Sequence, residues 1–80
     1  MDTVAEFTQS ARDHAARTGI LERLRTFSPD ARIVTGDLIE FAGDGGTETF
    51  VVYARRLRVR PDGRQTLAFV LDYPPRHPRP

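Results

Sequence analysis

The strongest local signal in the chain is a turn sequence between two long β-prone segments. Pro61-Asp62-Gly63 has the residues of a tight turn, since proline presets φ at the first turn position and glycine accepts a positive φ. The flanking segments, Thr47–Arg60 and Gln65–Tyr73, are rich in β-branched and aromatic residues. The sequence therefore predicts a long antiparallel hairpin with a bulge at Gly63.

A second hairpin is expected immediately before the first. Ile33–Phe41 is rich in β-branched and aromatic residues and predicts a strand. Gly43-Asp44-Gly45-Gly46, which follows it, is typical of a hairpin loop. Because both connections are short, we expect three strands in an antiparallel meander, with Thr47–Arg60 in the centre.

The N-terminal third has a helical pattern. Thr3 and Glu6 have the spacing of a capping box. The apolar residues that follow at helical intervals are Val4, Phe7, Ala11 and Ala15. Gly19 is expected to end this helix, or to weaken it if the helix continues. A second short helix is predicted by the apolar face of Ile20, Leu21, Leu24 and Phe27. Ser28-Pro29 ends it, because the residue before proline leaves helical space.

These elements predict a two-layer α+β fold. One or two N-terminal helices pack on one face of the three-stranded antiparallel meander, in the order α-α-β-β-β. The chain has 80 residues, which is enough for one domain. We expect that domain to span residues 1–73, and the proline-rich residues 74–80 to form an extended, flexible tail.

Composition excludes several kinds of chemistry. The sequence has no cysteine, so it forms no disulfide and offers no thiolate nucleophile or cysteine zinc ligand. All twelve basic residues are arginine, which is typical of a GC-rich genome and excludes a Schiff-base lysine. No apolar run approaches the roughly 20 residues that span a bilayer, and the N-terminus has no signal-peptide pattern. A cytoplasmic location is therefore expected.

The segment YARRLRVR, residues 53–60, combines four arginines with alternating apolar residues. The apolar set changes faces near Arg55-Arg56, which predicts a β-bulge at that point. Such a bulge would bring together Phe50, Val52, Ala54, Leu57 and Val59. In either register Arg56, Arg58 and Arg60 line the other face, which is a solvated surface, a surface that follows phosphates, or one that binds an acidic protein surface.

Apolar residues occur on both faces of the last predicted strand. Leu67, Phe69 and Leu71 share one face, while Ala68 and Val70 lie on the other. A sheet covered by helices on one side needs no apolar residues on its open side. This surplus suggests that the open face is covered, most simply by a second copy of the chain.

Three functional hypotheses follow. The first is a small non-enzymatic binding or adaptor protein that acts through its sheet surface, alone or as a homodimer. The alternative is a nucleic-acid-binding module, because residues 41–80 carry seven arginines and four acids and so have a charge of +3. The third is a small ribonuclease that would use Tyr53, Arg56, Arg58 and His77. The predicted binding residues are Tyr53, Arg56, Arg58, Arg60 and Arg64.

No catalytic residue, metal site or cofactor is predicted. The sequence has two histidines, His14 and His77. His14 is expected at the boundary of the first helix's apolar stripe, and His77 falls in the tail, where a general base would be poorly positioned. The tail also has the P-x-x-P spacing of segments that dock in aromatic grooves, although an exposed solubilising end is the simpler interpretation.

Overall fold

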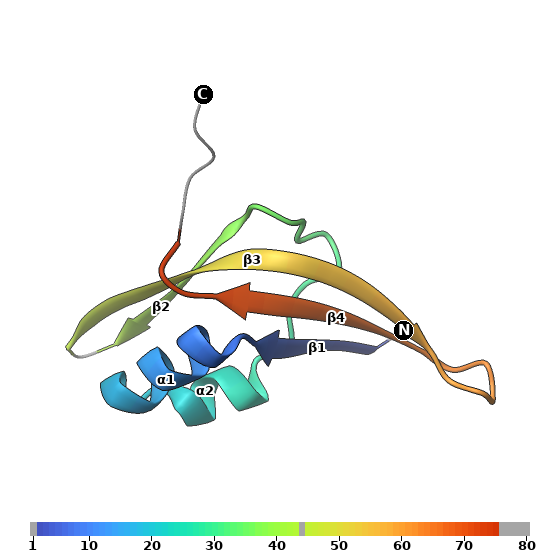
Figure 1. Cartoon of the computed structure of the whole chain (residues 1–80), viewed down its shortest axis with the longest axis horizontal. Coiled ribbons are helices and arrows are strands. Elements are labelled where there is room, and N and C mark those ends of the chain that lie inside the picture. The colour runs from blue at the N-terminus through green and yellow to red at the C-terminus, as the bar shows by residue number, and fades with distance from the viewer. Residues whose placement is uncertain (1, 44, 76–80) are drawn as a thin grey trace.

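The computed structural model describes residues 2–43 and 45–75 and has an α+β fold with two helices and four strands (Figure 1). The elements, in chain order, are β1 (Asp2–Phe7), α1 (Gln9–Thr18), α2 (Leu21–Thr26), β2 (Leu38–Gly43), β3 (Gly46–Val59) and β4 (Gln65–Asp72). Most of the tail, including His77 and Pro78, lies outside the described residues. Among the described residues, neither helix is long and apolar enough to cross a membrane.

The sheet is four-stranded and mixed, so the three-stranded antiparallel meander is only part of it. Its strand order is β1-β4-β3-β2, and the β2–β3 and β3–β4 pairs are antiparallel as expected. β1 pairs in parallel with β4, and Val4 lies opposite Ala68. β3 and β4 are therefore the central strands, and β1 and β2 are the edge strands.

The predicted helix start at Thr3 is wrong. The helix begins six residues later, and its N-cap is Thr8, whose Oγ1 accepts a hydrogen bond of 3.2 Å from the backbone N–H of Ala11. The same hydroxyl donates to Asp72 Oδ1 at 2.6 Å, which ties the helix start to the end of β4. The Thr3–Glu6 spacing fits a capping box. In the folded chain, however, Ala5 and Phe7 lie opposite the core residues Phe69 and Leu71 of β4, and the segment pairs with β4 as a strand.

Gly19 ends α1, as expected. It adopts a left-handed conformation with φ of 78°, and the N–H of Ile20 donates to the carbonyl of Ala15 at 3.0 Å. This arrangement satisfies carbonyl groups that the last turn of a helix otherwise leaves unpaired. α2 then covers the predicted second apolar face and ends before Phe27, so there are two separate helices.

The two predicted hairpins are confirmed, but the first strand starts later than expected. β2 begins at Leu38, and residues 27–37 form a loop instead of the predicted strand start at Ile33. At the second turn Gly63 has φ of 89°, and the N–H of Arg60 donates to the carbonyl of Arg64 at 2.8 Å. Asp37 Oδ2 accepts from the N–H of Val34 at 2.9 Å, so the loop is held by a local turn bond.

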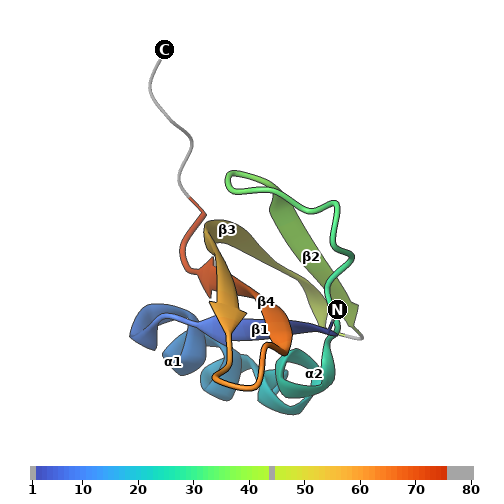
Figure 2. The ribbon, with the colours of Figure 1, turned by 90° about the vertical axis from the view of Figure 1, so that its right-hand side faces the viewer.

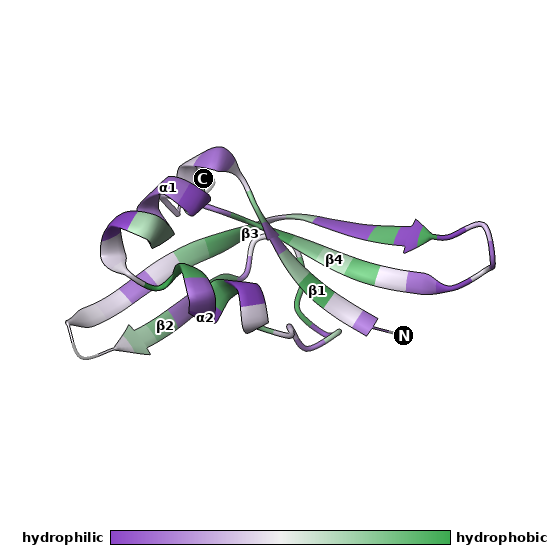
Figure 3. Cartoon of the chain, turned by 90° about the horizontal axis from the view of Figure 1, so that it is seen from below, coloured by the Kyte–Doolittle hydropathy of each residue, from purple (hydrophilic) through white to green (hydrophobic). Residues whose placement is uncertain are grey.

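The hydrophobic core lies between the two helices and one face of the sheet. Figure 3, seen from the helix side, shows apolar residues on the strands and on parts of the helices. We call this side of the sheet the core face and the opposite side the outer face. The buried core residues are Ala11, Ala15, Leu24, Phe41, Phe50, Val52, Leu67, Phe69 and Leu71. Phe27 and Ile33, from the loop after α2, also pack against this cluster.

The sheet is strongly curled, and one end of it extends past the helices (Figures 1 and 2). α1 and α2 lie beneath one half of the sheet, and the turn between β3 and β4 projects from the other half. The molecule measures 42 × 34 × 21 Å as a result. We call residues 55–66, which form the projecting part of this hairpin, the arm.

Candidate functional site

A β-bulge in β3 decides which way the arginines of the arm point. The register with β4 shifts between Val52 and Ala54, so the extra residue is Tyr53, two residues before the predicted position. Beyond the bulge Arg55, Leu57 and Val59 lie opposite Phe69, Leu67 and Gln65. They are therefore on the core face, which confirms the grouping of Leu57 and Val59 with Val52.

Ala54 does not belong to that group, because it lies opposite Val70 on the outer face. Arg56 and Arg58 follow it there at two-residue intervals, as predicted. Leu57 and Val59 share a face with the core but are not buried, since 52% and 62% of their surfaces are exposed. The core face of the arm is therefore apolar and uncovered.

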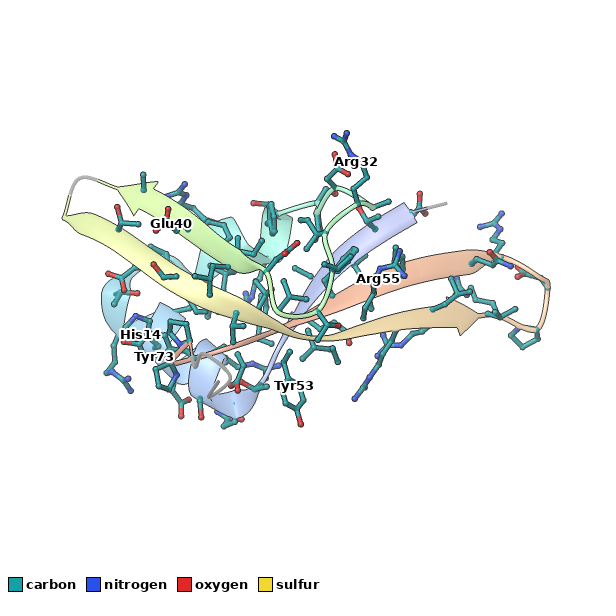
Figure 4. All side chains as sticks on the ribbon, turned by 90° about the horizontal axis from the view of Figure 1, so that it is seen from above. His14, Arg32, Glu40, Tyr53, Arg55 and Tyr73 are labelled. Atoms are coloured by element: carbon teal, nitrogen blue, oxygen red, sulfur yellow. The ribbon has the colours of Figure 1, made fainter. Side chains whose placement is uncertain are left out.

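Arg55 lies where the core gives way to the arm. Its guanidinium carbon is 5.8 Å from the centre of the Phe69 ring, and its Nη2 donates to the carbonyl of Ala31 at 3.3 Å. Figure 4 shows Arg55 next to the loop and Tyr53 extending from the other side of β3. Arg55 thus covers the end of the core, whereas Tyr53 remains 60% exposed.

On the outer face, Arg58 reaches across β4 to β1. Its guanidinium forms a two-pronged ion pair with Glu6, in which Nη2 is 2.8 Å from Oε1. Ala68 and Val70, which lie between these strands, are buried. The apolar residues on the outer face of β4 are therefore covered within a single chain, and they do not call for a second copy.

Arg60 and Arg64 lie at the turn end of the arm. The backbone N–H of Arg64 donates to Asp62 Oδ1 at 3.0 Å, and the Arg64 guanidinium is 3.7 Å from Oδ2 of the same carboxylate. A hollow beside this turn is lined by Asp2, Gly63, Arg64 and Gln65. Arg56 and Arg60 make no ion pair with any residue that the structure describes.

The structure brings the predicted binding residues onto one projecting element but not onto one face. Arg56 and Arg58 point to the outer face, Tyr53 lies at the bulge, and Arg60 and Arg64 flank the turn. The arm carries five arginines and one acid, Asp62, and Glu6 neutralises one of these arginines. The arm and Glu6 together keep a net charge of +3, which attracts anionic partners.

Among the described residues, no strand lies beside the edge of β3 that faces away from β4 along the arm. β2 pairs with β3 only over Gly46–Val51. The loop extends this cover by one residue, because the N–H of Val52 donates to the carbonyl of Asp37 and its carbonyl accepts from Gly36. In residues 2–43 and 45–75, no turn or loop bond reaches the backbone of Arg55, Leu57 or Val59.

A second cluster lies at the opposite, helix-covered end of the sheet. The ring of His14 stacks on Tyr73, with centroids 3.6 Å apart and planes within 8°, and packs edge-on against Phe50. Its Nε2 lies 2.5 Å from Oε1 of Glu48. Figure 4 shows His14 and Tyr73 side by side at this end. His14 is buried at the edge of the core, near the boundary position expected for it.

The sequence offers no local signal for the His14–Glu48 pair, since the two residues are 34 positions apart. A hollow next to Glu48 is lined by Thr18, Ile20, Phe41 and three glycines of the β2–β3 turn. Within the described part of the chain, no three His, Asp or Glu side chains converge as metal ligands. His14 and Glu48 bond to each other, and the His14 ring packs on Tyr73 and Phe50 at the end of the core.

The loop after α2 holds a carboxyl whose pKa is clearly shifted. Both guanidinium nitrogens of Arg32 that face Asp30 donate to it, at 3.1 and 3.0 Å, and the backbone N–H of Arg32 adds a third bond. The side-chain hydrogen bonds from Arg32 lower the pKa of Asp30 from 3.8 to about 2. The same contact raises the pKa of Arg32.

Comparison of this chain with protein-family models, with curated proteins and with solved structures found no match. Its function is therefore argued from the geometry of the arm.

Proposed function

We propose that this chain is a non-enzymatic binding protein whose contact surface is the arm. The observation that supports this proposal is the edge of β3 beyond Val52, with which no described strand or loop segment pairs. Leu57 and Val59 flank this edge and are more than half exposed, and with Tyr53 they make up three of the five large apolar residues that are exposed in the described part of the chain. Exposed apolar side chains gathered on one element are typical of an interaction site.

The arm also has the charge to select a partner. Five arginines and one acid lie in residues 55–66, and an anionic partner would be attracted to them over a Debye length of about 10 Å in ordinary buffer. Arginine suits this role because its guanidinium pairs with carboxylate or phosphate through two bonds. We therefore propose that the partner is anionic where it meets the arm.

Self-association through this edge is disfavoured by the same charges. If β3 paired with β3 of a second copy, Arg56 and Arg58 would lie near their own counterparts, and like charges on facing strands are destabilising. We expect a monomer of about 9.0 kDa by light scattering up to high concentration. A dimer of the unmodified chain would instead restore the homodimer hypothesis.

Nucleic acid is the second candidate, and the excess of arginine on the arm is the observation that favours it. Such binding would weaken steeply with salt, because each phosphate contact releases a counterion. It would also weaken on joint replacement of Arg56 and Arg60, which have no ion-pair partner among the described residues. The ribonuclease hypothesis gains no further support, because His77 lies outside the described residues.

Photocrosslinking inside the cell tests the proposal. A benzophenone amino acid is placed at Val59 on the arm and, as the matched control, at Ala16 on the exposed side of α1. We expect a defined adduct from Val59 and much less from Ala16. Equal adducts at both positions would overturn the proposal, and a Val59 adduct that nuclease removes would favour the nucleic-acid candidate.

A further inference from the structure

The hydrogen-bond pattern of the hairpin shows which backbone groups of the arm point outward. In an antiparallel pair, residues alternate between bonding to the partner strand and pointing away from it. The N–H of Arg60 bonds to Arg64, which sets the phase of this alternation. Arg58 and Arg56 therefore bond to β4, and the N–H and C=O groups of Val59, Leu57 and Arg55 point to the open edge.

This open edge is the continuation of the edge of β3 that pairs with β2 and with the loop before it. β2 occupies the same side of β3 up to Val51, and the backbone of Gly36 and Asp37 takes up both polar groups of Val52. After the bulge at Tyr53, the next three outward-pointing residues have no such cover among the described residues. An added strand would therefore lie along the same side of β3 as β2, beyond the end of the loop.

The side chains beside the edge determine which residue types the added strand would have on each of its faces. On the core face, Leu57 and Val59 are exposed and apolar. On the outer face, Arg56 has no ion pair among the described residues, and Arg58 is held by Glu6. A strand paired with this edge would place alternate residues on these two faces. Its apolar residues would contact Leu57 and Val59, and its acidic residues would contact Arg56.

We propose that the arm binds an extended, acidic segment of another protein, in which acidic and apolar residues alternate, by adding it to β3 as a further strand. This inference rests on the proposed function of the arm. Main-chain bonds to three outward residues supply affinity, and the two flanks supply selectivity, as in other cases of strand addition. Arg55, Leu57 and Val59 span five residues of β3, so a partner segment of about seven residues covers them with one residue to spare at each end.

Nucleic acid would use less of this surface. Sheet surfaces that bind single strands stack bases on exposed aromatic rings, and Tyr53 is the one aromatic residue in residues 53–66. Phosphates would contact the arginines but would leave the outward backbone groups and the exposed Leu57 and Val59 without a complementary partner. The open edge and the apolar flank together favour a peptide.

The test is a titration of the ¹⁵N-labelled full chain with a capped seven-residue peptide of alternating Glu and Val. We expect hydrogen exchange to slow at the amides of Arg55, Leu57 and Val59, and to change little at Arg56 and Arg58, which already bond to β4. The same peptide with N-methyl groups at the alternate residues whose N–H groups would face β3 cannot form the ladder. It is expected to bind at least tenfold more weakly, whereas equal binding would overturn the proposal.

A charge swap supplies the second arm of the experiment. Arg56→Glu is expected to weaken binding of the Glu-Val peptide by about tenfold and to favour a Lys-Val peptide instead. Arg12→Glu is the matched control, because Arg12 is an exposed arginine on α1. It is expected to change neither affinity. An unchanged preference in the Arg56 variant would overturn the acidic selectivity.

Failure of this inference is distinguishable from failure of the proposed function. If oligonucleotides, but not the Glu-Val peptide, perturb the arm, the arm still binds a partner and only the strand-addition inference is wrong. The same conclusion follows if crosslinking at Val59 captures a partner while the peptide has no effect. If neither the peptide nor crosslinking engages the arm, both proposals are overturned.

Discussion

One strand, β3, runs through two regions that place apolar residues on the same face of the sheet but differ in burial and in charge. At the helix-covered end Phe50 is fully buried, and in the arm Leu57 and Val59 are mostly exposed. Phe50, Leu57 and Val59 all lie on the core face of the sheet. The difference is what lies over the strand, since helices and β2 cover one region and the arm extends past them (Figure 1). The pattern of apolar residues thus predicts which side chains lie on the core face, but not whether helices cover that face.

The two regions also differ in how their charges are satisfied. At the covered end, His14 and Glu48 pair with each other beneath Tyr73, within the packed structure. On the arm, Arg58 pairs with Glu6 on an accessible face, and Arg56 has no ion pair among the described residues. Buried polar pairs hold a structure together, whereas exposed charges contribute little to stability and remain free to meet a partner.

Replacing the core residue of each region gives the largest expected contrast. Phe50→Ala should lower the free energy of unfolding by about 4 kcal/mol, because it removes a fully buried aromatic ring. Leu57→Ala should lower it by less than about 1 kcal/mol, since that side chain is already half exposed. Urea unfolding measures both values. Similar losses would mean that the arm is covered in solution, which would break the comparison.

Removing His14 tests the polar pair at the covered end. His14→Ala should cost about 2 kcal/mol, because Glu48 loses a partner inside the structure and Tyr73 loses its stacked ring. A double-mutant cycle with Glu48→Gln separates the pair from the packing. Coupling near zero in that cycle would show that His14 acts through stacking alone.

Removing the ion pair on the arm's outer face should have a smaller effect. Glu6→Gln is expected to cost about 0.5 kcal/mol, since both side chains are partly exposed to solvent. Glu22→Gln, which affects the exposed pair with Arg25 on α2, is the control. A loss for Glu6→Gln several times that of the control would indicate that the cover over Ala68 and Val70 depends on this pair.

The smallest expected effect lies in the loop between the two regions. The pKa of Asp30 is lowered to about 2, so its contribution to stability is present above about pH 3.8 and disappears as the pH falls through about 2. Below that pH the carboxyl is protonated in both the folded and the unfolded chain. NMR titration of Asp30 in Arg32→Ala should return its pKa towards 3.8, and an unchanged pKa would contradict the assigned cause.

Part of the site could be predicted from the sequence. The turn at Pro61–Gly63, the two strands around it and the arginine face follow from local turn chemistry and two-residue alternation. The bulge was expected at Arg55-Arg56 and occurs at Tyr53. Its position depends on how β3 matches β4 on one side and the loop on the other, which alternation in one strand does not reveal.

The largest error concerns β1. Thr3–Glu6 fits both a helix cap and a strand, and local preference does not separate the two. The decision comes from β4, which lies about 64 positions along the chain and offers β1 a matching parallel edge. The start of β2 has the same explanation, because Ile33 packs on the core from a loop and is not paired in the sheet.

The sequence by itself determined the turns, the end of α1 at Gly19, the second helix and, except at the bulge beside Ala54, which strand residues share a face. These features depend on the φ and ψ preferences of a few neighbouring residues. Only the tertiary structure decided that β1 joins the sheet, that His14 meets Glu48, and that the edge of β3 stays open beyond Val52. Burial and edge cover come from segments tens of residues away, and a local pattern carries no information about where those segments fold.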